Sequence, residues 1–93
     1  MTDIGDRIHA ARLELALELE AMPRAQRIEA MQASRIETGG TIIPAGNGNW
    51  GPHFAEIDNL GVSHQGAELD EAIAHWIRAV LRIETAMALE TAA

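Results

Sequence analysis

Apolar residues recur at helical spacing through the first third of the chain, and this pattern predicts two helices. Between residues 3 and 22 an apolar residue falls at every third or fourth position, which makes one helix face apolar. The positions on this face are Ile4, Ile8, Ala11, Leu15 and Leu19, with Leu13 and Leu17 widening it. A second helical pattern follows at about 24–36, where Ile28 and Met31 share a side. Proline is favourable at a helix start and unfavourable inside a helix, so Pro23 marks either a boundary between two helices or a kink in one.

The middle of the chain changes to short runs that are typical of strands, separated by glycine-rich turns. Residues 41–43 are Thr-Ile-Ile, and β-branched residues of this kind favour a short strand. Pro44 restricts that strand to an edge or an end of a sheet. A loop rich in Gly and Asn follows. Beyond it the pattern predicts strands at about 53–58 and 62–65, with a tight connection at 59–61.

The last third carries the strongest helical pattern, at about 68–89. Its apolar positions alternate steps of four and three residues, which makes a seven-residue repeat. The members of this stripe are Leu69, Ile73, Trp76, Val80, Ile83 and Met87. Such a stripe packs either in the core of its own domain or against a helix of a second copy, and both remain open. The elements together predict one α+β domain over residues 1–93, with two N-terminal helices, a small antiparallel sheet of two or three strands and a long C-terminal helix.

Charge divides the chain into a mixed N-terminal part and an acidic remainder. The net charge is −7, Arg is the only formal cation, and residues 36–77 contain neither Lys nor Arg. Proteins that bind DNA or RNA directly gather Lys and Arg against the phosphates, so this balance argues against a nucleic-acid ligand. The absence of cysteine excludes disulfides and thiolate metal sites. No apolar run is long enough for a signal peptide or a membrane span, so we expect a cytoplasmic protein.

The acids of the cation-free stretch, together with one tryptophan, form the candidate site. Two of these acids stand at positions i and i+2 of a predicted strand and would share one face of it. The predicted partner-binding residues are Trp50, Glu56, Asp58, Glu68, Asp70 and Glu71. Each has an ordinary alternative, because acids aid solubility and stabilise the first turn of a helix. Trp50 either caps the core or is an exposed anchor for a partner.

The residue types that carry catalysis or hold cofactors form no motif. His53, His64 and His75 are too widely spaced to match a known metal-ligand motif. The glycine-rich loop around Trp50 lacks the lysine of a phosphate-binding loop. The Ser and Thr residues stand near no acid–base partner that would activate them. We therefore expect no metal, no cofactor and no enzymatic activity.

Three runs of the second half resemble the core of the HicB-like antitoxins. They are Phe54-Ala-Glu56, Leu60-Gly61-Val62-Ser-His-Gln-Gly66 and Leu69-Asp-Glu71-Ala72-Ile73. The resemblance covers residues 54–81, but it lacks the family's usual proline before the turn glycine, and two helices precede the sheet where the family usually begins with strands. It implies a strand, turn, strand and helix in that order. It also implies a protein that holds a small basic RNA-cleaving toxin inactive by direct contact.

In size, acidity and lack of a catalytic motif the chain is also similar to small phage-borne inhibitors such as anti-CRISPR proteins. We therefore expect a non-enzymatic inhibitor that presents an acidic face to a basic nucleic-acid-handling protein and competes with phosphate sterically and electrostatically. The alternative is a structural or assembly protein that self-associates through the stripe of the last helix. Monomer and homodimer both remain open.

Overall fold

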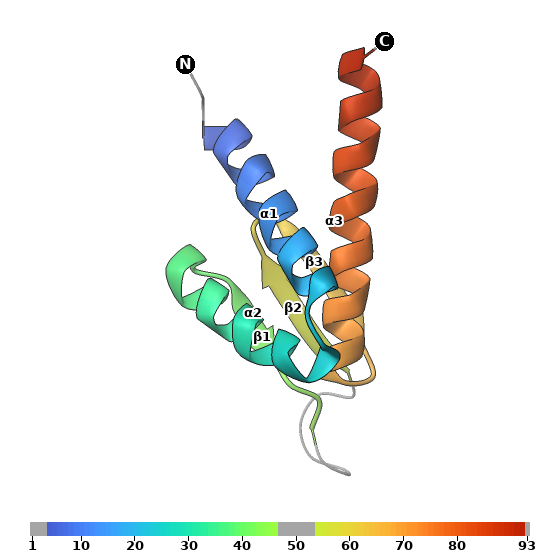
Figure 1. Cartoon of the computed structure of the whole chain (residues 1–93). Coiled ribbons are helices and arrows are strands. Elements are labelled where there is room, and N and C mark those ends of the chain that lie inside the picture. The colour runs from blue at the N-terminus through green and yellow to red at the C-terminus, as the bar shows by residue number, and fades with distance from the viewer. Residues whose placement is uncertain (1–3, 47–53, 93) are drawn as a thin grey trace.

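The computed structural model describes residues 4–46 and 54–92, which form three helices and one three-stranded sheet (Figure 1). In chain order the elements are α1 (Ile4–Ala21), α2 (Arg24–Thr38), β1 (Thr41–Ile43), β2 (Ala55–Asn59), β3 (Val62–Gly66) and α3 (Leu69–Ala92). The predicted α+β class, small antiparallel sheet and long C-terminal helix are confirmed. Trp50 and His53 lie outside the described residues.

Backbone chemistry sets the limits of the first two helices. Pro23 stands before α2 with a φ of −58°, where its missing N–H breaks no helical hydrogen bond. Arg27 then reaches back to the end of α1, where its Nε donates to the carbonyl of Leu19 at 2.7 Å. Gly39 ends α2 in the left-handed region, at φ 77°, and donates its N–H to the carbonyl of Arg35 at 2.8 Å. Of the two alternatives at Pro23, the boundary between two helices is therefore correct.

The strands form an antiparallel sheet in the order β1-β2-β3. Only Leu60 and Gly61 connect β2 to β3, with φ angles of 52° and 81°. Two central residues with positive φ are the signature of a type I′ turn, whose twist matches that of the hairpin. The sequence pattern placed Asn59 in this turn. The structure places it at the end of β2, paired with Val62, because its side chain is buried against the helices.

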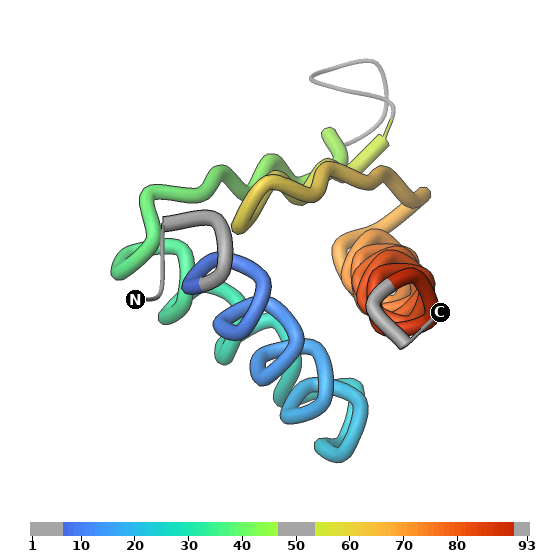
Figure 2. Tube along the Cα trace, turned by 90° about the horizontal axis from the view of Figure 1, so that it is seen from above, coloured from blue at the N-terminus to red at the C-terminus, as the bar shows by residue number. Residues whose placement is uncertain are grey.

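The three helices lie on the same side of the sheet (Figure 2). Residues of β2 alternate accordingly, as successive side chains of a strand point to opposite faces. Ala55, Ile57 and Asn59 are buried on the helix side. Glu56 and Asp58 point to the other face, which we call the open face of the sheet.

The first half of the α3 stripe lies at the centre of the core. Its fully buried members are Ile73, Trp76 and Val80. The indole N–H of Trp76 donates to the carbonyls of Asn59 (3.2 Å) and Val62 (3.1 Å), which satisfies the one polar atom of this side chain. Gly66 allows α3 to approach β3 closely, because a Cβ there would lie 2.5 Å from the backbone nitrogen of Ala72.

The second half of the stripe extends beyond the core. Ile83 and Met87 are each 37% exposed. A helix of 24 residues is about 36 Å long, roughly twice the length of a five-residue strand. The core interpretation of the stripe therefore holds up to Val80.

Helix α1 follows its predicted apolar face at Leu15 and Leu19, which pack in or against the core, and departs from it elsewhere. Arg12 and Ala16 are buried, whereas Ile8 and Leu17 are 37% and 50% exposed. The predicted apolar face is wrong at Ile8 and Leu17, because the charged side chain of Arg12 is buried instead. Arg12 can do so because Glu84 of α3 provides a partner for it across the helix interface.

Candidate binding groove between α1 and α2

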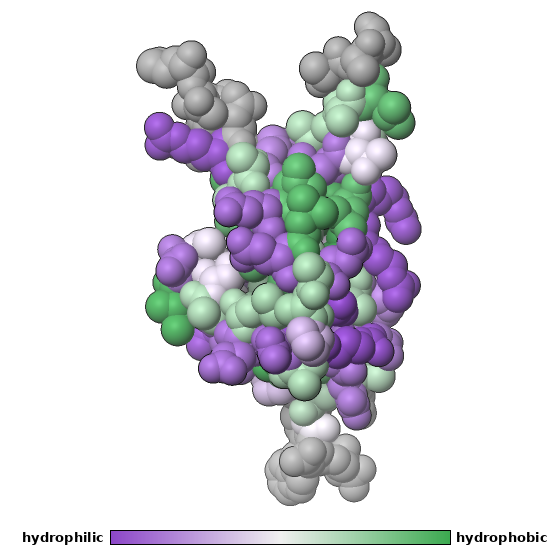
Figure 3. Space-filling model, viewed as in Figure 1, coloured by the Kyte–Doolittle hydropathy of each residue, from purple (hydrophilic) through white to green (hydrophobic). Residues whose placement is uncertain are grey.

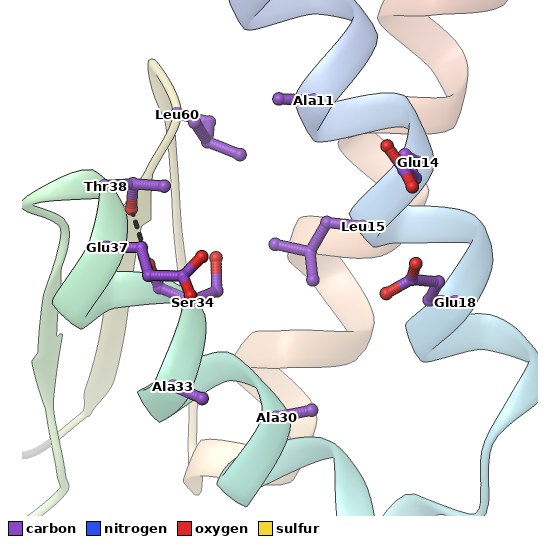
Figure 4. Close-up of a pocket in the computed structure, with 10 residues that line it drawn as sticks. All are labelled: Ala11, Glu14, Leu15, Glu18, Ala30, Ala33, Ser34, Glu37, Thr38 and Leu60. Atoms are coloured by element: carbon purple, nitrogen blue, oxygen red, sulfur yellow. Dashed lines mark hydrogen bonds between the residues drawn. The ribbon is translucent and has the colours of Figure 1, made fainter.

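A groove of ≈330 Å³ runs between α1 and α2 beside the hairpin turn (Figure 4). The two helices meet at Pro23 and diverge from there (Figure 1), which opens a space between their facing sides. Both helices and the turn contribute to the lining, which consists of Ala11, Glu14, Leu15, Glu18, Ala30, Ala33, Ser34, Glu37, Thr38 and Leu60. The groove thus combines an apolar floor with polar and acidic edges.

The floor depends on the hairpin turn as much as on the helices. Leu15 and Leu60 are half-buried, and their side chains point into the space between the helices (Figure 4). Leu60 reaches this position from a backbone with φ 52°, which residues other than glycine seldom adopt. Arg12 ties the turn to α1, since its Nη1 donates to the Leu60 carbonyl at 3.3 Å. The turn therefore forms a third wall of the groove.

Three carboxylates stand around this floor. Glu14 and Glu18 lie one turn apart on α1, and Glu37 extends from α2 toward the same space (Figure 4). All three are exposed, and none forms an ion pair within the part of the chain that the structure describes. Like charges at positions i and i+4 destabilise a helix by about 0.2–0.5 kcal/mol. The acids on α1 therefore carry a small local cost that no neighbouring cation offsets.

Buried Asn59 anchors the α2 wall to the sheet. Its Nδ2 donates to Ser34 Oγ at 3.1 Å and to Met31 Sδ at 3.4 Å. The Thr38 hydroxyl lies within hydrogen-bond distance of both Asn59 Oδ1 and the Ser34 carbonyl. Gly40 leaves room for this amide, because a Cβ there would lie 2.7 Å from Asn59 Oδ1. A buried polar group with all its partners in place favours one arrangement, so Asn59 sets the position of α2 on β2.

The opposite side of α1, which faces α3, is closed by a charged pair. Arg12 Nε donates to Glu84 Oε1 at 2.7 Å, and the two side chains are only 8% and 12% exposed. His9 Nδ1 lies 3.0 Å from the same oxygen and 2.6 Å from Arg12 Nη2, so it serves one of these partners at a time. Burial raises the pKa of Glu84, but the hydrogen bonds and charges of Arg12 and His9 outweigh it and hold the pKa below the ordinary value of 4.5.

The structure divides the predicted acidic site between two elements. Glu56 and Asp58 share the open face of the sheet, in agreement with their spacing. Glu68, Asp70 and Glu71 lie at the start of α3, and α3 packs on the other face of the sheet. The five carboxylates thus form two groups on opposite sides of the sheet rather than a single cluster.

Two of the acids at the start of α3 have local structural roles. Glu71 Oε1 accepts a hydrogen bond from the backbone N–H of Ala67 at 3.3 Å. Asp70 Oδ1 accepts one from the backbone N–H of Glu71 at 2.9 Å. These N–H groups have no acceptor within the helix, so side-chain acceptors stabilise its start. Helix capping therefore explains part of this acidity.

The groove acids Glu14, Glu18 and Glu37 are not among the residues that the sequence predicts to bind a partner. The first two carried a signal, since two acids four residues apart repel each other on a helix without helping it to form. No feature of the sequence marks Glu37, because its position opposite α1 depends on how α2 folds back at Pro23.

The Ser34 hydroxyl in the groove lining is engaged with the sheet, since its Oγ accepts a hydrogen bond from Asn59. Among the described residues that line the groove there is no histidine. No group of three or more carboxylate or imidazole side chains in the described ranges is placed to hold a metal ion. In the same ranges, none of the helices has the length and apolarity that crossing a membrane requires.

Comparison of the chain with protein-family models, with curated proteins and with solved structures found no match.

Proposed function

We propose that the protein is a non-enzymatic binding protein that inhibits a basic nucleic-acid-handling protein in the cytoplasm. A segment of that partner, with Arg or Lys beside a small apolar residue, enters the groove between α1 and α2. One observation carries this proposal. Three carboxylates that form no ion pair with any described residue, those of Glu14, Glu18 and Glu37, surround an apolar floor.

The chemistry of the groove selects a cationic segment. Carboxylates accept paired hydrogen bonds from a guanidinium group, and such charge-assisted bonds are stronger than neutral ones. Leu15 and Leu60 offer apolar surface to a small side chain of the same segment. The net charge of −7 speeds the encounter with a basic partner. A partner whose phosphate-binding cations are held in this way is no longer free to bind nucleic acid.

The other predicted residues enter the proposal as a supporting surface. Glu56 and Asp58 extend the negative charge over the open face of the sheet. The resemblance of residues 54–81 to HicB-like antitoxins supports the same class of function, since those proteins block a basic toxin by contact. Charge reversal at Glu71 is a less specific test than a change in the groove, because it also removes a hydrogen bond that stabilises the start of α3.

The test compares two triple variants of equal net charge. The groove variant carries Glu14→Gln, Glu18→Gln and Glu37→Gln. The control variant changes three exposed acids that do not line the groove, namely Glu20→Gln, Glu29→Gln and Glu90→Gln. Each protein is immobilised and exposed to a bacterial lysate. Bound proteins are eluted with increasing salt, identified, and assayed for nucleic-acid binding with and without the wild-type chain.

We expect the wild type and the control to retain a basic nucleic-acid-binding protein, and the groove variant to lose it. Elution of that protein should depend steeply on salt, because surface charge pairs are screened. Addition of the wild-type chain should displace its nucleic acid. Equal retention by all three chains, or retention only of proteins without a nucleic-acid-binding surface, would overturn the proposal.

The far end of α3 favours a second candidate function, self-association in an assembly. Apolar side chains gather between α1 and α3 where these helices diverge (Figure 3). Exposed apolar residues on the two helices include Ile8, Ile83 and Leu89. Sedimentation tests this function directly. A salt-insensitive dimer that Ile83→Glu dissociates supports it, and a wild-type chain that remains monomeric at high concentration contradicts it.

A further inference from the structure

A second hollow, of ≈290 Å³, lies where the edge strand β3 meets α3. Its lining consists of His64, His75, Arg78, Ala79 and Arg82. All of these except the alanine are cationic or become cationic on protonation. Among the described residues, no acidic side chain lines this hollow, and none of its lining residues belongs to the groove between α1 and α2.

Helix periodicity brings these side chains together. His75, Arg78 and Arg82 follow one another at spacings of three and four residues, so they occupy one face of α3. His64 joins them from β3, with its ring centroid 6.4 Å from that of His75 and the two ring planes at 64°. The Nδ1 of His75 is 2.7 Å from the Gln65 carbonyl and must donate to it, because a carbonyl only accepts. This bond orients the ring and leaves its Nε2 for a ligand.

The positive charge of this hollow is not neutralised within the described part of the chain. Both ion pairs found there involve Glu84, and neither includes Arg78 or Arg82. The two guanidinium groups lie at positions i and i+4 of one helix, where like charges repel. They are also the only Lys or Arg side chains in residues 39–93 of an acidic protein. Such a cluster is stabilised when an anion binds to it.

Other charged groups surround the hollow without lining it. They are Glu71 one turn earlier on α3, Glu56 on β2, Glu20 on α1, and Arg24 and Arg27 on α2. Glu71 accepts its hydrogen bond from the N–H of Ala67. Glu56 lies on the open face of the sheet, where it lines a neighbouring hollow with His64. The charges that face the hollow itself are therefore all positive.

We propose that this hollow binds the phosphate group of a small anion, either free or as a phosphomonoester. The two arginines supply planar pairs of donors that match the oxygens of a tetrahedral anion. The rings of His64 and His75 add N–H donors to this lining.

Titration with sulfate at neutral pH tests the proposal, because sulfate is a tetrahedral anion of fixed charge whereas the charge of phosphate varies with pH. The histidine and backbone NMR signals of the full chain are followed at constant ionic strength, with chloride as the balancing salt. The test variant is Arg78→Gln/Arg82→Gln. The matched control is Arg7→Gln/Arg35→Gln, which removes the same charge at exposed positions outside the hollow. Parallel titrations use inorganic phosphate and glycerol phosphate.

We expect saturable shifts of the His64 and His75 signals in the wild type and the control, and binding weaker by about tenfold or more in the test variant. His64→Gln should weaken binding by a smaller factor than the test variant, and it leaves the bond between His75 and Gln65 in place. Tighter binding of glycerol phosphate assigns the site to a phosphomonoester, and tighter binding of inorganic phosphate assigns it to the free ion.

Three results would overturn the proposal. They are shifts that do not saturate, equal binding by the two double variants, and signal shifts in the wild type that spare both His64 and His75. None of them bears on the groove, whose acids are unchanged in every variant of this experiment.

Discussion

Helix α1 has two interfaces of opposite character. Toward α3, Arg12 and Glu84 form a pair that is mostly buried. Toward α2, Glu14 and Glu18 are exposed around a groove and pair with no described cation. Burial of a charge is costly unless a partner accompanies it, so the closed interface includes its own counter-charge. The charges at the open interface pair with no cation among the described residues, so we propose that they contact a partner protein.

The two interfaces also differ in what holds them. Side chains of α1 and α3 bond to each other directly across their interface. Helices α1 and α2 are connected at the margins of their groove, where Arg27 bonds to the Leu19 carbonyl. At the other margin, Asn59 ties Ser34 of α2 to the sheet. Hydrogen bonds at its two margins thus keep the groove open. The following experiments test both interfaces of α1.

Loss of Arg12 should have the largest effect. Arg12→Ala leaves the Glu84 carboxylate buried without its main partner, so we expect the free energy of unfolding to fall by about 3 kcal/mol. Chemical denaturation followed by circular dichroism measures this change. The double variant Arg12→Leu/Glu84→Leu should recover most of the loss, because apolar residues often replace a buried ion pair without cost. A loss below about 1 kcal/mol in the single variant would mean that other contacts close this interface.

Loss of the Asn59 side chain should have a smaller effect, on the groove side. Asn59→Ala removes the hydrogen bonds of a buried amide to Ser34 and Thr38 of α2 and should cost about 2 kcal/mol of unfolding free energy. Hydrogen exchange should speed up in α2 more than in α3, since Asn59 bonds to Ser34 and Thr38 of α2. Asp58→Ala, at the exposed neighbouring position, is the control and should change little. Uniform acceleration in all helices would show that Asn59 supports the whole fold and has no special role for α2.

Acid should weaken the closed interface. The pKa of Glu84 in the folded chain lies below its ordinary value of 4.5. A group of this kind contributes its stability in full above the ordinary value, and loses it as the pH falls through the folded pKa. Below about pH 4.5 the unfolding free energy should therefore fall more steeply in the wild type than in Arg12→Leu/Glu84→Leu. Parallel pH profiles for the two chains would contradict this role of Glu84.

The groove acids should have the smallest effect on stability. The triple variant Glu14→Gln, Glu18→Gln, Glu37→Gln should keep its unfolding free energy within about 0.5 kcal/mol of the wild type. The change should be slightly stabilising, because it removes the repulsion between neighbouring acids on α1. Thermal denaturation checks this at low salt, where the repulsion is least screened. Marked destabilisation would show that these acids serve the fold and not a partner.

Local chemistry explains why most of the fold was predictable. Pro23 and Gly39 delimit helices through their own backbone preferences, so the sequence indicates a break at Pro23, and the structure shows that this break separates two helices. The turn was harder, because asparagine is common in turns whereas leucine rarely adopts a positive φ. The structure nevertheless buries Asn59 and assigns the positive φ to Leu60. Burial with three partners on α2 outweighed the local preference.

The sequence by itself determined the elements, their order and the overall acidity, since these depend on neighbours along the chain. Only the tertiary structure decided which acids have partners. Glu84 is neutralised by Arg12, which lies 72 residues away in sequence, whereas Glu14 lies on the same helix as Arg12 and has no such pair. Electrostatic interaction depends on distance and burial in space, and sequence separation specifies neither. The same physics makes the groove acidic on one side of the fold and the hollow around Arg78 and Arg82 basic.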